Sequence, residues 1–154
     1  MKGSIFDWKN QVIGKFFELL VVYYFQKKGY NFEWSPHDEF GQVDIQVSSG
    51  KFHFLCECKI TLHSDFKEQV RILRKKAEKH KKVNSDRKNS EFLEPKICVW
   101  NSINSERREI LRNDYSIKII NFKEEIFNTN RIFANMSEKS RIRKILDNEF
   151  LNDL

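Results

Sequence analysis

The stretch GQVDIQVSSGKFHFLCECKI, residues 41–60, decides the fold of this 154-residue chain. It predicts two strands, residues 41–48 and 52–60, because apolar and polar residues alternate in both and successive strand side chains point to opposite faces of a sheet. The glycine between the two runs favours a tight connection. Residues 41–60 therefore predict an antiparallel hairpin.

Side-chain parity places three charged side chains on one face of this hairpin. A turn at residues 50–51 puts Asp44 opposite Glu57, and a turn at residues 49–50 puts them on a diagonal; both turns keep them on the same face. Lys59 shares that face, because it follows Glu57 by two residues. The other face is apolar and carries Val43, Ile45, Val47, Phe54, Cys56 and Cys58.

Two carboxylates and a lysine on one face can form a metal site that cleaves phosphodiesters. Opposed strand side chains lie about 4.5–5.5 Å apart, a span that one cation can fill. Mg²⁺ prefers oxygen ligands and is usually held by one or two carboxylates with waters and substrate phosphate oxygens. We expect Asp44, Glu57 and the Cys58 backbone carbonyl to hold Mg²⁺ or Mn²⁺. We expect Lys59 to orient the attacking water and offset charge on the phosphate.

Asp44 followed by Glu57-Cys58-Lys59 resembles the signature of the PD-(D/E)XK nuclease superfamily, which includes restriction enzymes, Holliday junction resolvases, Mrr-type enzymes and CRISPR ancillary nucleases. Val43 stands where the signature has Pro, which is not a metal ligand. The resemblance covers most of the chain. It implies an α/β fold with a restriction endonuclease-like core (αβββαβ), in which helices flank a central mixed sheet.

The same resemblance implies two supporting site residues. Many members carry a carboxylate on the first helix that assists the metal, and Glu18 occupies that place; a surface glutamate on a buried helix is the alternative. Gly14, one turn earlier, is expected to let this helix lie close to the sheet. Gln69 matches a glutamine that the family places on its next helix facing the site, and a polar residue at the edge of a core stripe is the alternative.

Periodicity and boundary signals predict the remaining elements. They are helices at residues 6–28, 64–82, 105–113 and 137–154, and strands at residues 30–35, 96–101 and 116–122. The continuous apolar run in the strand at 96–101 favours a central, parallel strand. No internal repeat or linker is evident, so residues 1–154 are expected to form one domain.

A net charge of +6 and a pI near 9.2 favour a polyanionic partner, with DNA as the leading candidate. Cations are concentrated on the helix that follows the strand carrying Lys59. A single-signed run in that place favours phosphate contacts over a merely solvated face. The expected contacts are Lys67, Arg71, Arg74, Lys75, Lys79 and Lys82.

Other features favour a cytoplasmic protein. The longest apolar run, residues 19–25, is shorter than the roughly 20 residues of a membrane span, and no signal-peptide pattern follows Met1. The three cysteines lack zinc-ligand spacing and are expected to be reduced core residues.

The sequence therefore predicts a Mg²⁺-dependent DNA endonuclease of the resolvase or the restriction and defence type. Because one site cuts one strand, a homodimer is expected for double-strand cleavage. Duplex, branched and single-stranded DNA all stay open as substrates. Three other hypotheses also stay open: a catalytically idle nucleic-acid-binding or assembly subunit, an RNA or single-strand nuclease of a defence system, and a Glu57–Lys59 charge pair without catalytic function.

Overall fold

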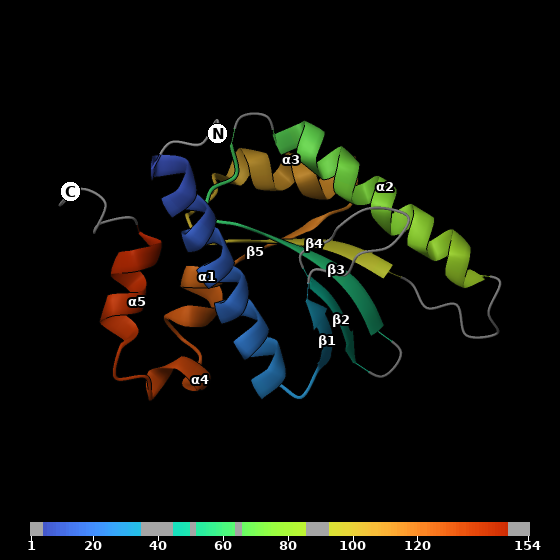
Figure 1. The fold of residues 1–154 in the computed structure, drawn as a ribbon. Coiled ribbons are helices and arrows are strands. Elements are labelled where there is room, and N and C mark those ends of the chain that lie inside the picture. Colours follow the sequence, from blue (N-terminus) through green and yellow to red (C-terminus); the bar gives the residue numbers. More distant parts are fainter. Residues whose placement is uncertain (1–4, 35–44, 50–51, 64–65, 86–92, 148–154) are drawn as a thin grey trace.

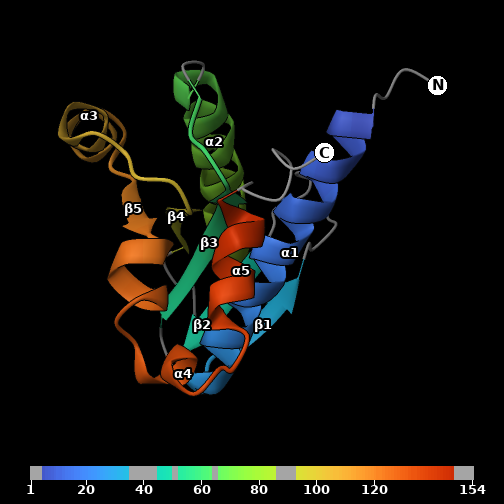
Figure 2. The ribbon, with the colours of Figure 1, turned by 90° about the vertical axis from the view of Figure 1, so that its left-hand side faces the viewer.

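The computed structural model describes residues 5–34, 45–49, 52–63, 66–85 and 93–147. These residues form a five-stranded sheet with helices on both faces (Figures 1 and 2). The strands are β1 (Asn31–Trp34), β2 (Ile45–Ser49), β3 (Phe52–Lys59), β4 (Leu93–Val99) and β5 (Lys118–Asn121). Their order across the sheet is the same as their order along the chain. The helices are α1 (Ile5–Lys27), α2 (Phe66–Ser85), α3 (Ser105–Tyr115), α4 (Arg131–Ala134) and α5 (Lys139–Leu146), with a π-helical segment at Lys123–Phe127.

The sheet is mixed. Strands β1, β2 and β3 pair antiparallel, and β4 pairs parallel with both β3 and β5. The apolar run that predicted an interior parallel strand is therefore confirmed as β4. Helices α2 and α3 form the two crossovers that parallel pairs require, and they lie together on one side of the sheet, whereas α1, α4 and α5 lie on the other (Figure 2).

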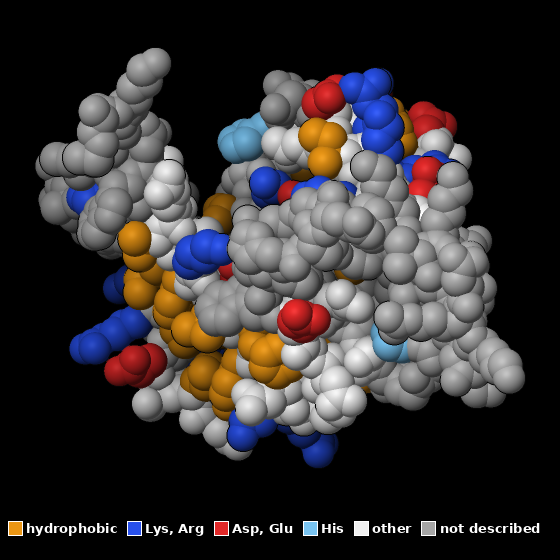
Figure 3. Space-filling view, turned by 45° about the vertical axis from the view of Figure 1, so that its right-hand side comes forward, with side chains coloured by type: hydrophobic (Ala, Val, Ile, Leu, Met, Phe, Trp, Pro, Cys, Tyr) orange, Lys and Arg blue, Asp and Glu red, His pale blue; other side chains and the backbone are white. Residues whose placement is uncertain are grey.

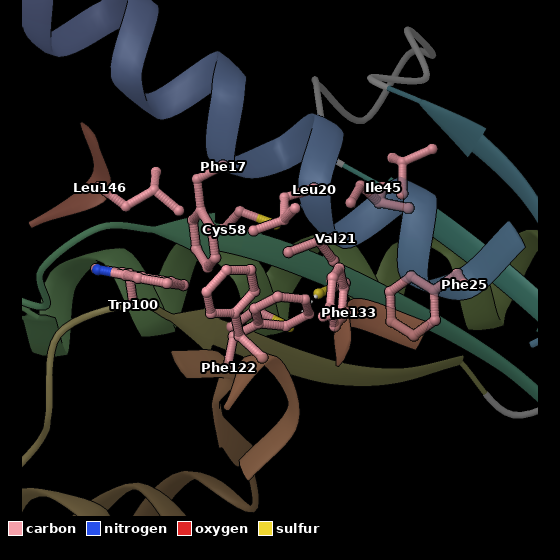
Figure 4. Close-up of a cluster of buried hydrophobic side chains, with 14 of the residues drawn as sticks. Phe17, Leu20, Val21, Phe25, Ile45, Cys58, Trp100, Phe122, Phe133 and Leu146 are labelled. Atoms are coloured by element: carbon pink, nitrogen blue, oxygen red, sulfur yellow. Dashed lines mark hydrogen bonds between the residues drawn. The ribbon is translucent and has the colours of Figure 1, made fainter. Parts of the chain in front are cut away.

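Each face of the sheet has its own apolar core. Under α2 and α3, the buried side chains include Leu55 from β3 and Ile97 from β4. Under α1, Phe17 lies at the centre of an aromatic cluster (Figure 4), with its ring edge-on to those of Trp100 at 6.1 Å and Phe122 at 5.6 Å. This alternation of faces along β3 and β4 is the period-two pattern of a sheet buried on both sides.

The C-terminal part closes the core over α1. Phe127 of the π-helical segment and Phe133 of α4 are both fully buried. Asp147, just after α5, accepts hydrogen bonds from Trp100 Nε1 at 2.7 Å and from Lys123 Nζ at 2.9 Å. These hydrogen bonds tie the end of α5 to the end of β4 and to the π-helical segment, and α5 also packs against α1.

Several predicted boundaries differ from the observed ones. The helix expected at 137–154 begins at Lys139 and its described part ends at Leu146, while residues 148–154 lie outside the described ranges. The strand expected at 41–48 is seen from Ile45, and residues 41–44 are also outside those ranges. Neither the π-helical segment nor α4 was predicted, because short elements without a repeating apolar stripe give no periodic signal.

Helix α1 is apolar on nearly every side. Its buried stripe includes Ile13 and Phe17, yet Val12 and Leu19 on the outer side are each about half exposed. Phe32 of β1 is also exposed. Figure 3 shows a band of apolar side chains along α1 on this face of the molecule. In the part of the chain that the structure describes, no helix combines the length and the apolar character that crossing a membrane needs.

Candidate active site at the end of strand β3

The pairing of β2 with β3 tests the predicted hairpin. Ile45 pairs with Cys56 and Ser49 with Phe52, so residues 50–51 connect the two strands. This is the register for which the sequence analysis places Asp44 opposite Glu57. Asp44 lies outside the described residues, so its pairing stays a prediction.

The two faces of β3 are those that parity predicted. Val47, Phe54 and Cys56 are buried together in the core under α1. Leu55 is buried in the core under α2. Because Glu57 and Lys59 have the parity of Leu55, they belong to the α2 face.

Glu57 and Lys59 form an ion pair where β3 ends. Glu57 Oε1 lies 3.7 Å from Lys59 Nζ, and their side chains are 24% and 37% exposed. Burial raises the pKa of the Glu57 carboxyl, while the ammonium groups of Lys59 and Lys76 oppose that rise. The pair therefore combines a carboxylate of increased basicity with a cation that can reach solvent, a combination suited to acid–base chemistry on a charged substrate.

A cleft of about 870 Å³ lies beside this pair, between α1 and α2. It opens at the upper edge of the molecule in Figure 3. Glu18 of α1, Lys59 of β3 and Gln69 of α2 all line it, so the structure brings together three side chains that the sequence analysis singled out. The cleft is lined by residues 10–15, Glu18, Cys58, Lys59, Ile60, Thr61, His63 and Gln69.

Glu18 is 7% exposed, and its Oε2 lies 3.1 Å from Lys15 Nζ on the same helix. This buried carboxylate in the cleft favours the site interpretation of Glu18 over that of a surface glutamate. Sequence reasoning missed Lys15, although its spacing of three residues from Glu18 is that of helical ion pairs. It also missed His63, an exposed cleft residue that no local pattern distinguishes.

The predicted nucleic-acid contacts on α2 have different surroundings. Lys67 and Lys75 are exposed, and the exposed side chain of Arg71 pairs with Glu68. Arg74 donates a hydrogen bond from Nη1 to the Tyr115 carbonyl at 2.9 Å, which ties α2 to α3. Lys79 and Lys82 belong to α2, but their side chains lie outside the described part.

Comparisons with known proteins support the architecture. No family model matches the chain, and no curated protein matches it. Among solved structures, the small subunit (R.BspD6I2) of the heterodimeric restriction endonuclease R.BspD6I is similar with a TM-score of 0.50. The superposition covers 90% of this chain and 81% of that chain, at 18% sequence identity.

The chain has a restriction endonuclease-like fold. At this identity the likeness extends to the architecture alone. The predicted fold class is thereby confirmed, with a mixed central sheet and flanking helices.

Gly14 does not have the role that we expected for it within this restriction endonuclease-like fold. A Cβ built on Gly14 would meet nothing within 4 Å, so no close approach of helix and sheet requires glycine there. Gly14 instead lines the cleft, where the missing side chain leaves open space. The error arose because the sequence does not reveal how a helix is rotated about its own axis.

Gly14→Ala is therefore expected to stabilise the protein by about 0.5–1 kcal/mol, because it removes a glycine from a helix interior without a clash. Gly29→Ala is the matched control. It also meets open space, but Gly29 has φ +84°, a conformation that L-residues avoid, so this variant is expected to lose stability. Urea denaturation of both variants measures the two changes. A destabilised Gly14→Ala variant would contradict the open environment.

The donor chemistry in this region suits a hard cation. Among the described residues, no three His, Cys, Asp or Glu side chains gather into a metal-binding group. Mg²⁺, however, is commonly held by one or two carboxylates and completed by waters and substrate oxygens. Glu57 and the backbone carbonyl of Cys58 would hold such an ion, with Asp44 as the predicted second carboxylate outside the described residues.

The raised pKa of Glu57 predicts how stability depends on pH. Above the unfolded-state pKa of a glutamate, the folded protein binds more protons at this group than the unfolded chain does, so stability falls as pH rises through the folded pKa. Glu57→Gln removes this dependence. We expect the variant to exceed the wild type in stability at pH 7 and to match it below about pH 4. Urea denaturation across this pH range provides the test, and equal stability at pH 7 would contradict it.

Proposed function

We propose that this chain hydrolyses phosphodiester bonds in DNA, using Mg²⁺ or Mn²⁺ held by Asp44, Glu57 and the Cys58 carbonyl. The observation that carries the proposal is the Glu57–Lys59 pair at 3.7 Å where β3 ends, next to a cleft that Lys59 shares with Glu18 and Gln69. A restriction endonuclease-like fold around this pair supports the assignment. The net charge of +6 also supports the assignment, because it favours a polyanionic substrate.

The roles of the residues follow from their positions. Lys59 is 37% exposed, so its ammonium group can orient the attacking water and stabilise the charge that develops on the phosphoryl oxygens. Glu57 has increased basicity because burial raises its pKa. When bound, the cation supplies charge neutralisation and a more acidic water. Glu18 and Gln69 would position water or phosphate across the cleft.

Phosphate contacts outside the cleft come from the exposed cations of α2. Lys67 and Lys75 are the strongest candidates, because the structure gives both of them exposed side chains. Arg74 is expected to contribute less, since its guanidinium is held by the Tyr115 carbonyl and Glu78. Such contacts would give binding that weakens steeply as salt concentration rises.

The test is cleavage of supercoiled, linear, single-stranded and four-way-junction DNA by the wild type beside Asp44→Ala. Each reaction is run with Mg²⁺, with Mn²⁺ and with EDTA, and a matched RNA tests the ribonuclease alternative. The proposal expects metal-dependent cutting of DNA that Asp44→Ala lacks. Cutting that is equal in both proteins, or that survives EDTA, would contradict it.

A second candidate is a subunit that binds DNA or assembles with a different chain. The similar structure is itself described as the small subunit of a heterodimeric restriction endonuclease, which favours this candidate. It predicts DNA binding in a mobility-shift assay without cleavage under any metal condition. The homodimer also stays a prediction, and sedimentation analysis of the wild type at several concentrations tests it.

A further inference from the structure

Three thiols meet directly beneath the candidate site, in the layer between the sheet and α1. Cys56 and Cys98 are fully buried and Cys58 is 8% exposed. The sulfur atoms of Cys56 and Cys98 lie 3.2 Å apart, and Cys58 is a hydrogen-bonding neighbour of both. Figure 4 shows Cys58 pointing into the same layer as Phe17 and Leu20. The cleavage chemistry proposed above uses none of these thiols.

Backbone spacing distinguishes the two pairs that could form a disulfide across β3 and β4. Cys58 and Cys98 are directly opposed in the parallel register. Neighbouring strands lie about 4.7–4.9 Å apart, within the roughly 4.4–6.8 Å between the Cα atoms of disulfides. Cys56 is opposite Lys96, so it is a diagonal neighbour of Cys98. Two residues of offset along a strand are about 6.6 Å, so the Cα atoms of Cys56 and Cys98 are about 8 Å apart, beyond the range that a disulfide spans without backbone movement.

The surroundings of the three sulfurs suggest different roles for them. The sulfur of Cys98 lies within reach of both other thiols. Cys58 lines the cleft and is 8% exposed, whereas Cys56 and Cys98 are fully buried. A molecule as small as hydrogen peroxide therefore reaches the group from solvent at Cys58.

We propose that Cys58 and Cys98 are a site of reversible oxidation that closes a disulfide between β3 and β4. The Cys58 sulfur attacks one peroxide oxygen, the O–O bond breaks, and hydroxide leaves and takes up the thiol proton, which gives a sulfenic acid at Cys58. The Cys98 sulfur then attacks the Cys58 sulfur, the S–O bond breaks and water leaves. Two thiols supply the two electrons that reduce one peroxide to two waters, and dithiothreitol reverses the change.

The position of the disulfide links it to the candidate site. Cys58 lies between Glu57 and Lys59, and its backbone carbonyl is the proposed third ligand of the cation. Drawing Cys58 toward β4 would move the carbonyl and both flanking side chains together. The disulfide is therefore expected to regulate the same site, and this consequence rests on the proposed function.

The experiment treats the folded protein with hydrogen peroxide, removes the peroxide, and then unfolds the protein and counts its thiols beside an untreated sample. The wild type should fall from three titratable thiols to one, and dithiothreitol should restore three. Cys58→Ala and Cys98→Ala should each keep both of their thiols, whereas Cys56→Ala, the matched control, should lose both. Circular dichroism on each sample verifies that oxidation occurs in the folded state.

Peptide mapping identifies the pair. Cleavage after Glu57 separates Cys56 from Cys58, so mass spectrometry distinguishes a Cys58–Cys98 disulfide from a Cys56–Cys98 disulfide. A wild type that keeps three thiols, a Cys58→Ala variant that loses both, or a disulfide between two molecules would overturn the proposal. In the same samples, DNA cleavage should fall on oxidation and return on reduction. The thiol counts decide the disulfide even if the protein cleaves no DNA.

Discussion

Lys59→Ala is expected to lower the rate of DNA cleavage by about a hundredfold or more while leaving the fold and most DNA binding intact. The Lys59 side chain is 37% exposed beside Glu57, so its removal takes a cation from the reacting phosphate without opening a cavity in the core. Single-turnover cleavage measures the loss, and circular dichroism checks the fold. A variant that cleaves at the wild-type rate would show that Lys59 is not catalytic.

Two further variants make this result specific. Lys59→Met keeps most of the aliphatic stem and should lose as much activity as Lys59→Ala. Lys118→Ala removes an exposed lysine of β5 that does not line the cleft, and it should cleave at close to the wild-type rate. Because Lys59 opposes the rise in the pKa of Glu57, any residual activity of Lys59→Met should need a higher pH than the wild type needs.

Phe17→Ala is expected to cost about 3–5 kcal/mol of the free energy of unfolding. Its ring is fully buried and packs edge-on against Trp100 and Phe122, so truncation leaves a cavity between α1 and the sheet. Such a loss is a large part of the roughly 5–15 kcal/mol that stabilises most domains. Urea denaturation of the variant and the wild type gives the difference.

Leu19→Ala is the matched control for this loss. Leu19 lies on the same helix, two residues from Phe17, but its side chain is 49% exposed. Leucine and alanine are both good helix formers, so we expect a change below about 1 kcal/mol. Equal losses in the two variants would mean that the face of α1 carrying Phe17 is not the one that packs against the sheet.

The sequence predicted the sheet and its faces because strand geometry has a fixed period of two residues. Parity alone separated Cys56 from Glu57, and the observed burial of Cys56 and Leu55 in different cores agrees with it. The same alternation brought out Glu57 and Lys59 as a pair. A pair of this kind can be predicted from a short stretch of sequence, because side chains two residues apart on a strand lie on the same face.

Other features depend on tertiary packing and could not be predicted. The cleft exists because α1 and α2 lie on opposite faces of the sheet and diverge beyond the end of β3 (Figure 2), which no local pattern encodes. The error at Gly14 has the same origin. Phe127 and Phe133 are core residues of two separate short elements, so no single period along the chain links them.

The closure of the core by α5 affects how the chain matures during translation. Leu146 belongs to the same core as Phe17, yet about 120 residues separate it from the end of α1. At the usual 5–20 residues per second, a ribosome needs roughly 6–24 s to make this interval. During that time the nascent first helix presents aromatic side chains without their final cover. Early chains are therefore natural clients for chaperones.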